Sequence, residues 1–366
     1  MKTRTTFTLF LTAILTLAAG SAFGAYSGGS GTAGAPYKIA TKTDLLALAA
    51  ATADYGKCFI LTADIDMIGQ VFTAPIIAAD GSPAFSGTFD GNGHKITNFT
   101  ISEDYYDIGL FGSIIGGSVK NLGIENCSVS GFYYVGCLVG YNAGGTISNC
   151  YSTGSVSGPS DSSNIGCLVG YNSGGTVSDC YSTGTAGGSS NVGCLVGWSS
   201  GTVSRCYATG SVTGDIIGGL VGENYSGGNI SNCYSTGSVS GVSYIGGLVG
   251  INQGGNISNC YSAGSVSGST SVGGLVGLNN SGSTVSSFWN TNTSGKTTSA
   301  GGTGKTTAQM KLISTFANWD FIETWGIIAN QTYPYLMTGP AADLNHDGTV
   351  DFADFAIFAE NWLAGE

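Results

Sequence analysis

The sequence has few charged residues, few histidines and few basic side chains. Asp, Glu, Lys and Arg make up 9% of its 366 residues, against a usual ~25%. Its 11 basic and 22 acidic side chains give a formal net charge of −11, which argues against nucleic acid or an anionic membrane surface as a partner. Only two histidines, His94 and His346, are available for acid–base chemistry.

Long apolar runs are absent after the first residues. Two basic residues precede an apolar run over 9–19, and a small-residue stretch ends at Gly24, a pattern typical of a secretory signal peptide. No later segment reaches ~18 uncharged apolar residues, so no transmembrane segment is expected in the mature chain. The sequence therefore predicts a bacterial protein that is exported by a signal peptide and is extracellular or at the cell surface.

Glycine is abundant, with 62 residues, and much of it lies in repeats. A phrase of the type Val-Gly-Cys-Leu-Val-Gly occurs seven times, and its closing glycines are Gly112, Gly140, Gly170, Gly197, Gly222, Gly250 and Gly277. These glycines are 25 to 30 residues apart, a period typical of a solenoid. Short β-branched runs between Gly, Ser and Asn predict strands and turns. We therefore expect an all-β, right-handed parallel β-helix with stacked coils.

A second phrase, most often Asn-Cys-Tyr, follows each copy of the first. Aligning the copies gives a cysteine column of Leu122, Cys150, Cys180, Cys206, Cys233, Cys260 and Phe288. Because Leu and Phe take the cysteine place at its two ends, this column is predicted to be an inward apolar ladder. Three repeats carry a second cysteine, Cys137, Cys167 or Cys194, so a disulfide across each of these coils is the alternative.

The position before the cysteine is mostly asparagine, which can form a hydrogen-bonded ladder when stacked in register. Asp179 and Arg205 take this position in two successive repeats. A surface ion pair is the simpler interpretation of these two residues, and a catalytic arginine is the alternative.

The position after the cysteine is aromatic, and strand alternation turns it outward if the cysteine points inward. The predicted stripe consists of Tyr151, Tyr181, Tyr207, Tyr234, Tyr261 and Trp289. Sugar rings stack on such stripes, so polysaccharide is a candidate ligand. The alternative is that neighbouring rings cover one another, or that a bend turns them inward.

The Leu-Val-Gly and Asn-Cys-Tyr phrases together resemble the GLUG-motif repeats of bacterial surface and secreted proteins. The resemblance covers Ile108 to Trp289, about half of the chain. It implies an extracellular β-helical stalk or adhesion module, and it carries no general catalytic motif. The stretch Phe85 to Ile96 resembles an entry coil of pectin-lyase-like β-helices, so the first coils are expected before the repeats.

The C-terminal tail carries a calcium-loop pattern. The expected ligands are Asp343, Asn345, Asp347, Thr349 through its carbonyl, Asp351 and Asp354, with Gly348 at the sharp turn. Apolar residues recur at helical spacing after this loop. The loop and its exiting helix resemble one repeat of a type I dockerin, which implies calcium as cofactor and a cohesin-like surface protein as partner. Dockerins carry two such repeats, and this chain shows one.

The chain thus divides into five predicted segments: a signal peptide over 1–24, an N-terminal cap with the first coils over 25–104, GLUG-type repeats over 105–290, a linker and C-terminal cap over 291–338, and the dockerin-like tail over 339–366. A short helix with Thr43 or Asp44 as its N-cap is expected in the first cap. A second helix is expected from Thr306 to Phe316 in the other cap.

Paired carboxylates, which a glycosidase needs at a fixed separation, do not recur in the repeats. The best candidates for enzyme chemistry are Asp64, Asp66, Asp90 and His94, near the first coils. The sequence therefore favours a non-catalytic adhesion or scaffold-associated module. A carbohydrate-active enzyme, either a glycoside hydrolase or a polysaccharide lyase, or an accessory of such a system is the alternative.

Overall fold

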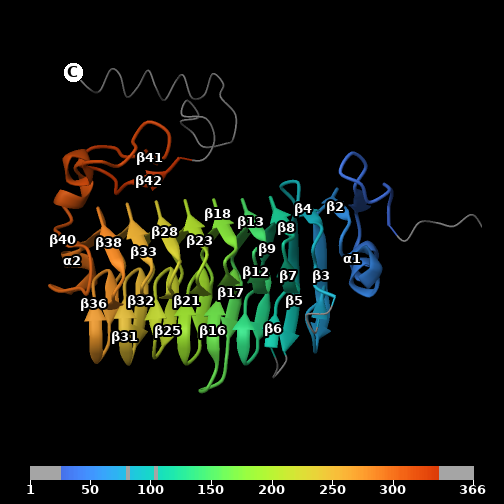
Figure 1. Cartoon of the computed structure of the whole chain (residues 1–366), viewed down its shortest axis with the longest axis horizontal. Helices are drawn as coiled ribbons and strands as arrows, with labels where there is room; N and C mark the ends of the chain where they lie inside the picture. The colour runs from blue at the N-terminus through green and yellow to red at the C-terminus, as the bar shows by residue number, and fades with distance from the viewer. Residues whose placement is uncertain (1–25, 80–82, 103–105, 338–366) are drawn as a thin grey trace, which may run out of the picture.

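The computed structural model describes residues 26–79, 83–102 and 106–337. These residues form a parallel β-solenoid in which the coils lie side by side along the long axis of the molecule (Figure 1). The predicted all-β, parallel β-helical class is confirmed. The predicted signal peptide and the calcium loop lie outside the described residues.

A ten-stranded parallel sheet runs the length of the solenoid. Its strands are, in spatial order, β1 (Tyr37–Ile39), β2 (Cys58–Leu61), β4 (Thr88–Asp90), β8 (Ser118–Lys120), β13 (Thr146–Ser148), β18 (Thr176–Ser178), β23 (Thr202–Ser204), β28 (Asn229–Ser231), β33 (Asn256–Ser258) and β38 (Ser283–Val285).

The largest sheet divides into two rows at the long strand β5 (Lys95–Ser102), which also pairs with β3 (Ile65–Phe72). The first row continues through β9 (Gly123–Glu125), β14 (Tyr151–Ser152), β19 (Tyr181–Ser182), β24 (Tyr207–Ala208), β29 (Tyr234–Ser235), β34 (Tyr261–Ser262), β39 (Phe288–Asn290) and β40 (Thr303–Lys305). The second row continues through β10 (Ser128–Ser130), β15 (Ser155–Ser157), β20 (Thr185–Gly187), β25 (Val212–Gly214), β30 (Val239–Gly241) and β35 (Val266–Ser267).

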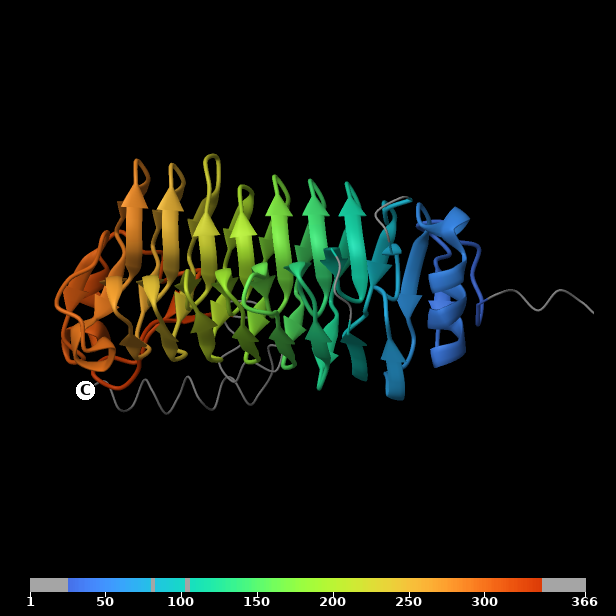
Figure 2. The same cartoon turned by 90° about the horizontal axis from the view of Figure 1, so that it is seen from below.

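Two seven-stranded sheets complete the coils (Figures 1 and 2). One contains β6 (Tyr106–Ile108), β11 (Tyr133–Val135), β16 (Ser163–Gly166), β21 (Ser190–Gly193), β26 (Ile217–Gly218), β31 (Ser243–Gly246) and β36 (Thr270–Gly273). The other contains β7 (Phe111–Ile115), β12 (Val139–Ala143), β17 (Val169–Ser173), β22 (Val196–Ser199), β27 (Val221–Asn224), β32 (Val249–Gln253) and β37 (Val276–Asn280).

The helix α1 (Lys42–Ala50) lies at the N-terminal end of the solenoid (Figure 2). Its N-cap is Thr41, not the predicted Thr43 or Asp44, and the Thr41 hydroxyl accepts a hydrogen bond from the Asp44 backbone N–H at 3.2 Å. Asp44 instead completes the capping box, since its carboxylate accepts from the backbone N–H of Thr41. A 3₁₀ turn, η1 (Thr52–Asp54), follows the helix.

The C-terminal segment, residues 306–337, folds back along the solenoid beside its last coils (Figure 1). The helix predicted over 306–316 is wrong. Only the 3₁₀ turns η3 (Gln309–Lys311) and η4 (Ile313–Phe316) form there, because Leu312 between them is extended at φ −110° and ψ 125°. The segment ends in a short antiparallel pair, β41 (Trp325–Gly326) and β42 (Tyr335–Leu336), and one helical turn, α2 (Thr291–Ser294), precedes it.

Each coil turns a corner at the residue before the cysteine, and this bend column needs a left-handed backbone. Its members Asn121, Asn149, Asp179, Arg205, Asn232 and Asn259 all have φ between 50° and 54°. Asn tolerates this conformation better than most residues, which explains why four of these six positions are Asn. Two of the amides also bond between coils, since Asn149 Nδ2 donates to Asn121 Oδ1 at 3.2 Å.

The cysteine column points inward, as predicted. Cys150, Cys180, Cys206, Cys233 and Cys260 are at most 1% exposed, and all are free thiols. Each sulfur lies 3.0–3.2 Å from the backbone carbonyl two residues earlier. Phe288 does not belong to the column, because the Ser287 hydroxyl takes the cysteine place and accepts from the Cys260 backbone N–H.

A column of buried asparagines runs through the interior beside the apolar core. Asn142, Asn172, Asn224 and Asn252 have no exposed surface. Within this asparagine ladder, Asn142 Nδ2 donates to Asn172 Oδ1 at 2.8 Å and Asn224 Nδ2 donates to Asn252 Oδ1 at 2.9 Å. Ser199 interrupts the ladder between the two pairs. At the start of each pair, Oδ1 of Asn142 and of Asn224 has no hydrogen-bond partner among the described residues.

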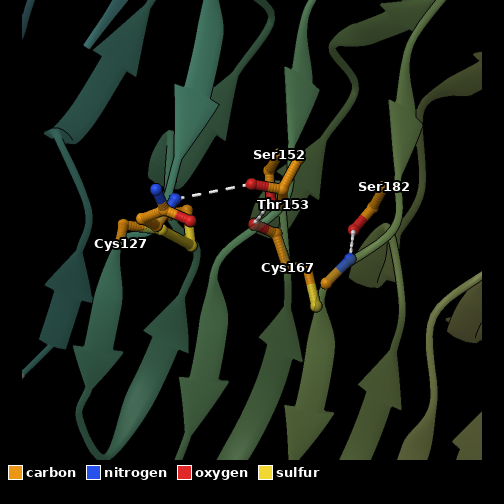
Figure 3. The surroundings of a disulfide bond; sticks show 8 residues. Cys127, Ser152, Thr153, Cys167 and Ser182 are labelled. Atoms are coloured by element: carbon orange, nitrogen blue, oxygen red, sulfur yellow. Dashed lines mark hydrogen bonds between the residues drawn. A yellow bond between two sulfur atoms is a disulfide. The ribbon is translucent and has the colours of Figure 1, made fainter. Parts of the chain in front are cut away.

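One disulfide joins Cys127, just before β10 of the second row, to Cys137, just after β11 of a seven-stranded sheet (Figure 3). Cys127 heads a column that continues with Gly154, Gly184 and Gly210. A Cβ at Gly184 would lie 2.1 Å from the carbonyl oxygen of Gly154, and one at Gly210 only 1.6 Å from that of Gly184. The later coils therefore require glycine there, so that column offers no cysteine to Cys167 or Cys194. These two thiols remain free and lie in hydrogen-bond contact with each other. The alternative of disulfides to Cys150, Cys180 and Cys206 is wrong.

Candidate functional site

The outward side of the first row carries a column of tyrosines, which we call the tyrosine face. Tyr151, Tyr181, Tyr207, Tyr234 and Tyr261 pair in register from one coil to the next. Alternation within each two-residue strand turns the following residue, Ser or Ala, into the core, where Ser152, Ser182 and Ala208 are fully buried. The strands therefore orient these five tyrosines outward, as predicted.

The tyrosine rings lie face to face along the solenoid axis. Their centroids are 4.9–5.1 Å apart and their planes are inclined by only 3–5°. Each ring therefore covers the face of its neighbour, as the alternative interpretation of the sequence supposed. A sugar ring has no open aromatic face to stack on between them, and the edges and hydroxyl groups are what the column presents outward.

Trp289 is not part of the tyrosine face, which corrects the prediction. Phe288 pairs with Tyr261, and Trp289 pairs with Ser262 one position further along. Trp289 therefore points inward, is 6% exposed, and donates its indole N–H to the carbonyl of Lys296. The physical reason is the alternation of the strand, since a residue one position beyond an outward residue faces the core.

The C-terminal segment covers the last two tyrosines. Trp325 lies 6.2 Å, between ring centroids, from both Tyr234 and Tyr261, and Tyr261 is only 2% exposed. The Tyr261 hydroxyl donates to the carbonyl of Pro334 at 2.7 Å, and the Trp325 indole N–H donates to Oδ1 of Asn232 at 3.3 Å. Of the predicted stripe, Tyr151 and Tyr181 do not pack against this segment, whereas Tyr207 at its edge is partly buried against the same apolar cluster.

A pocket lies where the open part of the tyrosine face meets the C-terminal segment. It has a volume of about 270 Å³ and is lined by Asn149, Asp179, Tyr181, Arg205, Tyr207, Leu336 and Met337. The predicted ion pair forms here, with Arg205 Nε 2.5 Å from Asp179 Oδ1. Arg205 also donates through Nη2 to the carbonyl of Met337 at 3.1 Å, which attaches the C-terminal segment to the solenoid.

The pocket tyrosines act as neutral hydroxyl groups. Burial raises the pKa of Tyr207 to about 12, and burial also raises the pKa of Tyr181 above its usual range. Neither phenol ionises near neutral pH, so each can donate and accept a hydrogen bond. Among the described residues no protein group bonds to either hydroxyl, whereas the Tyr151 hydroxyl donates to Glu125 Oε1 at 2.8 Å.

A polar cluster lies at the other end of the tyrosine face. Lys95 occupies the tyrosine position two coils before Tyr151 and forms an ion pair with Glu125 at 2.9 Å. His94 Nδ1 lies 3.0 Å from Asp64 Oδ1. Hydrogen bonding from His94 lowers the pKa of Asp64, and hydrogen bonds from Lys95 and Tyr151 lower the pKa of Glu125. Both carboxyls are therefore ionised acceptors at neutral pH.

The four acid–base candidates do not converge. Asp64 lies beside His94, but Asp66 accepts from Asn98 Nδ2 and Asp90 forms an ion pair with Lys120 at 3.2 Å. Hydrogen bonds hold the pKa of Asp66 and of Asp90 below the usual value for a carboxyl group, although burial opposes this at Asp90. A glycosidase pairs an ionised carboxylate with a protonated one, and these candidates provide only ionised carboxylates.

Sequence reasoning missed a second aromatic column on another side of the solenoid. Tyr141, Tyr171 and Trp198 pair in register on β12, β17 and β22, and the Tyr171 and Trp198 rings are stacked with centroids 4.2 Å apart. Tyr134 and Tyr225 extend the cluster at 4.6 and 5.3 Å. The sequence did contain a pattern for this column, because an aromatic residue follows the closing glycine of the Leu-Val-Gly phrase in three repeats.

Nearby carboxyls have raised pKa values but are far apart. Burial raises the pKa of Asp107 to about 6, and burial raises the pKa of Glu223 as well. Asp107 belongs to the coil of β6, whereas Glu223 lies on β27, several coils further along. They do not form a carboxylate pair.

The described residues contain no cluster of three or more His, Cys, Asp or Glu side chains that could hold a metal ion. The predicted calcium ligands lie outside the part of the chain that the structure describes. None of the described helices has the length and apolar character needed to cross a bilayer.

Fold and repeats together define a parallel β-solenoid in which part of the repeat array carries the GLUG motif. Residues 133–157, 216–240 and 241–267 match the GLUG motif. Halomucin of Haloquadratum walsbyi is 36% identical over 140 residues, and this match covers 36% of the chain but only 2% of halomucin. The chain therefore spans a small fraction of this relative.

A solved structure, that of a candidate immunoglobulin A1 protease from Bacteroides ovatus, has the same fold. It superimposes with a TM-score of 0.58 and 24% sequence identity, covering 86% of this chain and 95% of that one. At this identity the similarity establishes the architecture alone.

Proposed function

We propose that the chain is a secreted or cell-surface, non-catalytic β-helical module that binds polysaccharide at the open end of the tyrosine face. The GLUG repeats and the partial similarity to halomucin support a surface or secreted location. The binding role rests on one observation. The pocket beside Arg205 combines an ion pair, two phenol hydroxyls that have no partner in the described part of the chain, and the apolar side chains of Leu336 and Met337. Ligand pockets typically combine apolar walls with a few fixed polar groups in this way.

The predicted tail adds a second proposal. The calcium-loop pattern from Asp343 to Asp354 would give the module a calcium-dependent attachment to a cohesin-like surface protein. Its support is the spacing of the oxygen-bearing residues and the glycine at the sixth position.

The binding role is tested with the full chain and a panel of insoluble polysaccharides. We expect depletion of the protein by at least one polymer, and a loss of that depletion in the double variant Tyr181→Ser, Tyr207→Ser, which removes both hydroxyl-bearing rings from the pocket. Asn256→Ala, on the exposed side of β33 in the ten-stranded sheet, is the matched control. Equal depletion by the double variant and the unmodified chain would exclude this pocket as the binding site.

The enzyme alternative has one observation in its favour, the contact between His94 and Asp64 at 3.0 Å. It predicts the release of reducing ends or unsaturated products from a polymer, and the loss of this release in His94→Ala. Product release that survives His94→Ala, or no release from any polymer that the chain binds, contradicts catalysis at this contact.

A further inference from the structure

The polar groups of the pocket beside Arg205 favour one kind of ligand. We propose that it binds the uncharged sugar at the end of a glycan chain, with adjacent sugar hydroxyls held between Arg205 and Asp179. This inference rests on the proposed polysaccharide-binding function and specifies the ligand of the same site.

The pocket offers both donors and acceptors. A guanidinium has five N–H groups. Arg205 uses one at Nε on Asp179 and one at Nη2 on the Met337 carbonyl, so three have no partner among the described residues. The second carboxylate oxygen of Asp179 and the amide oxygen of Asn149 remain as acceptors beside them. Neighbouring hydroxyls on a sugar both donate and accept, so they complement this mixed set.

The charge of the pocket disfavours acidic sugars. Arg205 is 33% exposed and Asp179 is 35% exposed, and they neutralise each other. A uronate carboxylate that approached Arg205 would also lie close to the carboxylate of Asp179, and like charges at this distance repel. An uncharged sugar meets no such repulsion, so Asp179 disfavours the binding of acidic ligands.

The C-terminal segment makes the pocket a chain-end site. Leu336 and Met337 form one wall, and beyond that wall the tyrosine face is covered at Tyr234 and Tyr261. A polymer that continued past Tyr207 would collide with this segment. The volume of about 270 Å³ lies just under the ~300–1,000 Å³ usual for drug-sized ligands, which suits a terminal unit.

The bend column supplies variants that keep the backbone of each coil, although Arg205→Asn also removes the hydrogen bond to the Met337 carbonyl. Arg205 and Asp179 both have left-handed backbones, at φ 53° and 54°, and Asn occupies the same position in neighbouring coils. Arg205→Asn and Asp179→Asn therefore introduce a residue that the column already accommodates. Asn259→Asp, in the same column but away from the pocket, is the matched control.

The experiment is competition for binding of the full chain to the polysaccharide that depletes it. The competitors are methyl glycosides of uncharged hexoses, the corresponding uronic acids, and the same polymer before and after partial acid hydrolysis. We expect hydrolysis to raise the inhibition per gram, because it creates chain ends, and we expect the uncharged glycosides to compete better than the uronic acids. Arg205→Asn should weaken binding by about tenfold or more, since charge-assisted hydrogen bonds are lost.

The variant Asp179→Asn separates a role of Asp179 in ligand choice from a role in stability alone. It removes the negative charge and leaves Arg205 unpaired, so the discrimination against uronic acids should disappear while circular dichroism stays unchanged. Inhibition per gram that falls on hydrolysis, or a preference of the unmodified chain for uronic acids, would overturn the inference while leaving polysaccharide binding intact. No depletion by any polysaccharide would instead remove the proposed function itself.

Discussion

Asn252 donates its side-chain amide to Oδ1 of Asn279 across 3.0 Å, inside a coil where Asn252 has no exposed surface. The same amide donates to the Gly255 carbonyl at 3.2 Å, and Oδ1 of Asn252 accepts from Asn224. One side chain thus joins three successive coils through buried polar groups, which cost free energy when they lose their partners.

Replacing Asn252 with Ala should lower the free energy of unfolding by about 2–4 kcal/mol, because buried groups of Gly255 and Asn279 lose their donor. The neighbouring change Asn256→Ala, at an exposed position, should cost less than about 0.5 kcal/mol. Urea unfolding followed by circular dichroism measures both. Equal losses for the two variants would contradict a structural role for the asparagine ladder.

The column of glycines that follows Cys127 continues to Gly237, and it leads to a second prediction about stability. A Cβ at Gly237 would lie 1.7 Å from the carbonyl oxygen of Gly210, so Gly237→Ala should force the coils apart and cost about 2–3 kcal/mol or more. Gly34 has open space around its Cβ position, and Gly34→Ala should be close to neutral. Thermal unfolding of the two variants tests this, and a stable Gly237→Ala protein would show that the coils can separate at little cost.

Thiol counting tests the cysteine assignments. The native protein should react readily at Cys58 alone, because the other free cysteines are buried. Denaturation without reductant should expose the eight free thiols, and reduction should add the two from Cys127 and Cys137. Fewer than eight thiols before reduction would reveal a second disulfide. Cys127→Ser should cost about 2–3 kcal/mol, as expected for a short disulfide loop.

The raised pKa of Asp107 predicts a pH dependence of stability. Burial raises this pKa from 3.8 to about 6, so the folded state holds a proton that the unfolded state releases. The favourable contribution is complete below pH ~4 and is lost as the pH rises through about 6. Asp107→Asn should remove this loss and raise the melting temperature more at pH 7 than at pH 4. A shift that is equal at both pH values would contradict the assignment.

Calcium binding is predicted from the sequence of the tail. Isothermal titration of the full chain with millimolar calcium should give heat that disappears in Asp347→Ala, with a dissociation constant of ~10⁻⁵ to 10⁻³ M for a single unpaired loop. The melting temperature of the solenoid should not change, because none of the predicted ligands lies in the repeats. Identical heats for the two proteins would mean that the tail is only an acidic turn.

The sequence predicted the parts of this fold that depend on the repeat length and on the alternation of side chains in strands. Regular spacing identified the coils, and alternation placed Cys180 inward and Tyr181 outward. The error at Trp289 came from aligning by residue type, although the 27-residue step from Gly250 to Gly277 is repeated from Tyr261 to Phe288. Spacing was the stronger signal because hydrogen-bonded register leaves no freedom to slip by one residue.

Other features depend on contacts between distant parts of the chain. Nothing local to Trp325 indicates that it will cover Tyr234 and Tyr261, since this contact forms only when the C-terminal segment folds back. The Cys127–Cys137 pair was not predicted either, because Cys127 occupies a position that later coils fill with glycine, so the repeats give no cysteine column there. The pocket likewise depends on this fold-back, because Leu336 and Met337 form one of its walls.

The direction of the inter-coil hydrogen bonds has a mechanical consequence. In every parallel sheet these bonds run along the long axis of the solenoid, so a pull on its two ends loads the coils in series. An end coil has neighbours on one side only and should peel first, and the chain would lengthen in steps of about one repeat. The Cys127–Cys137 link would withhold the loop between its two cysteines when the coil that contains it unfolds, so a fully stretched molecule should be longer after reduction.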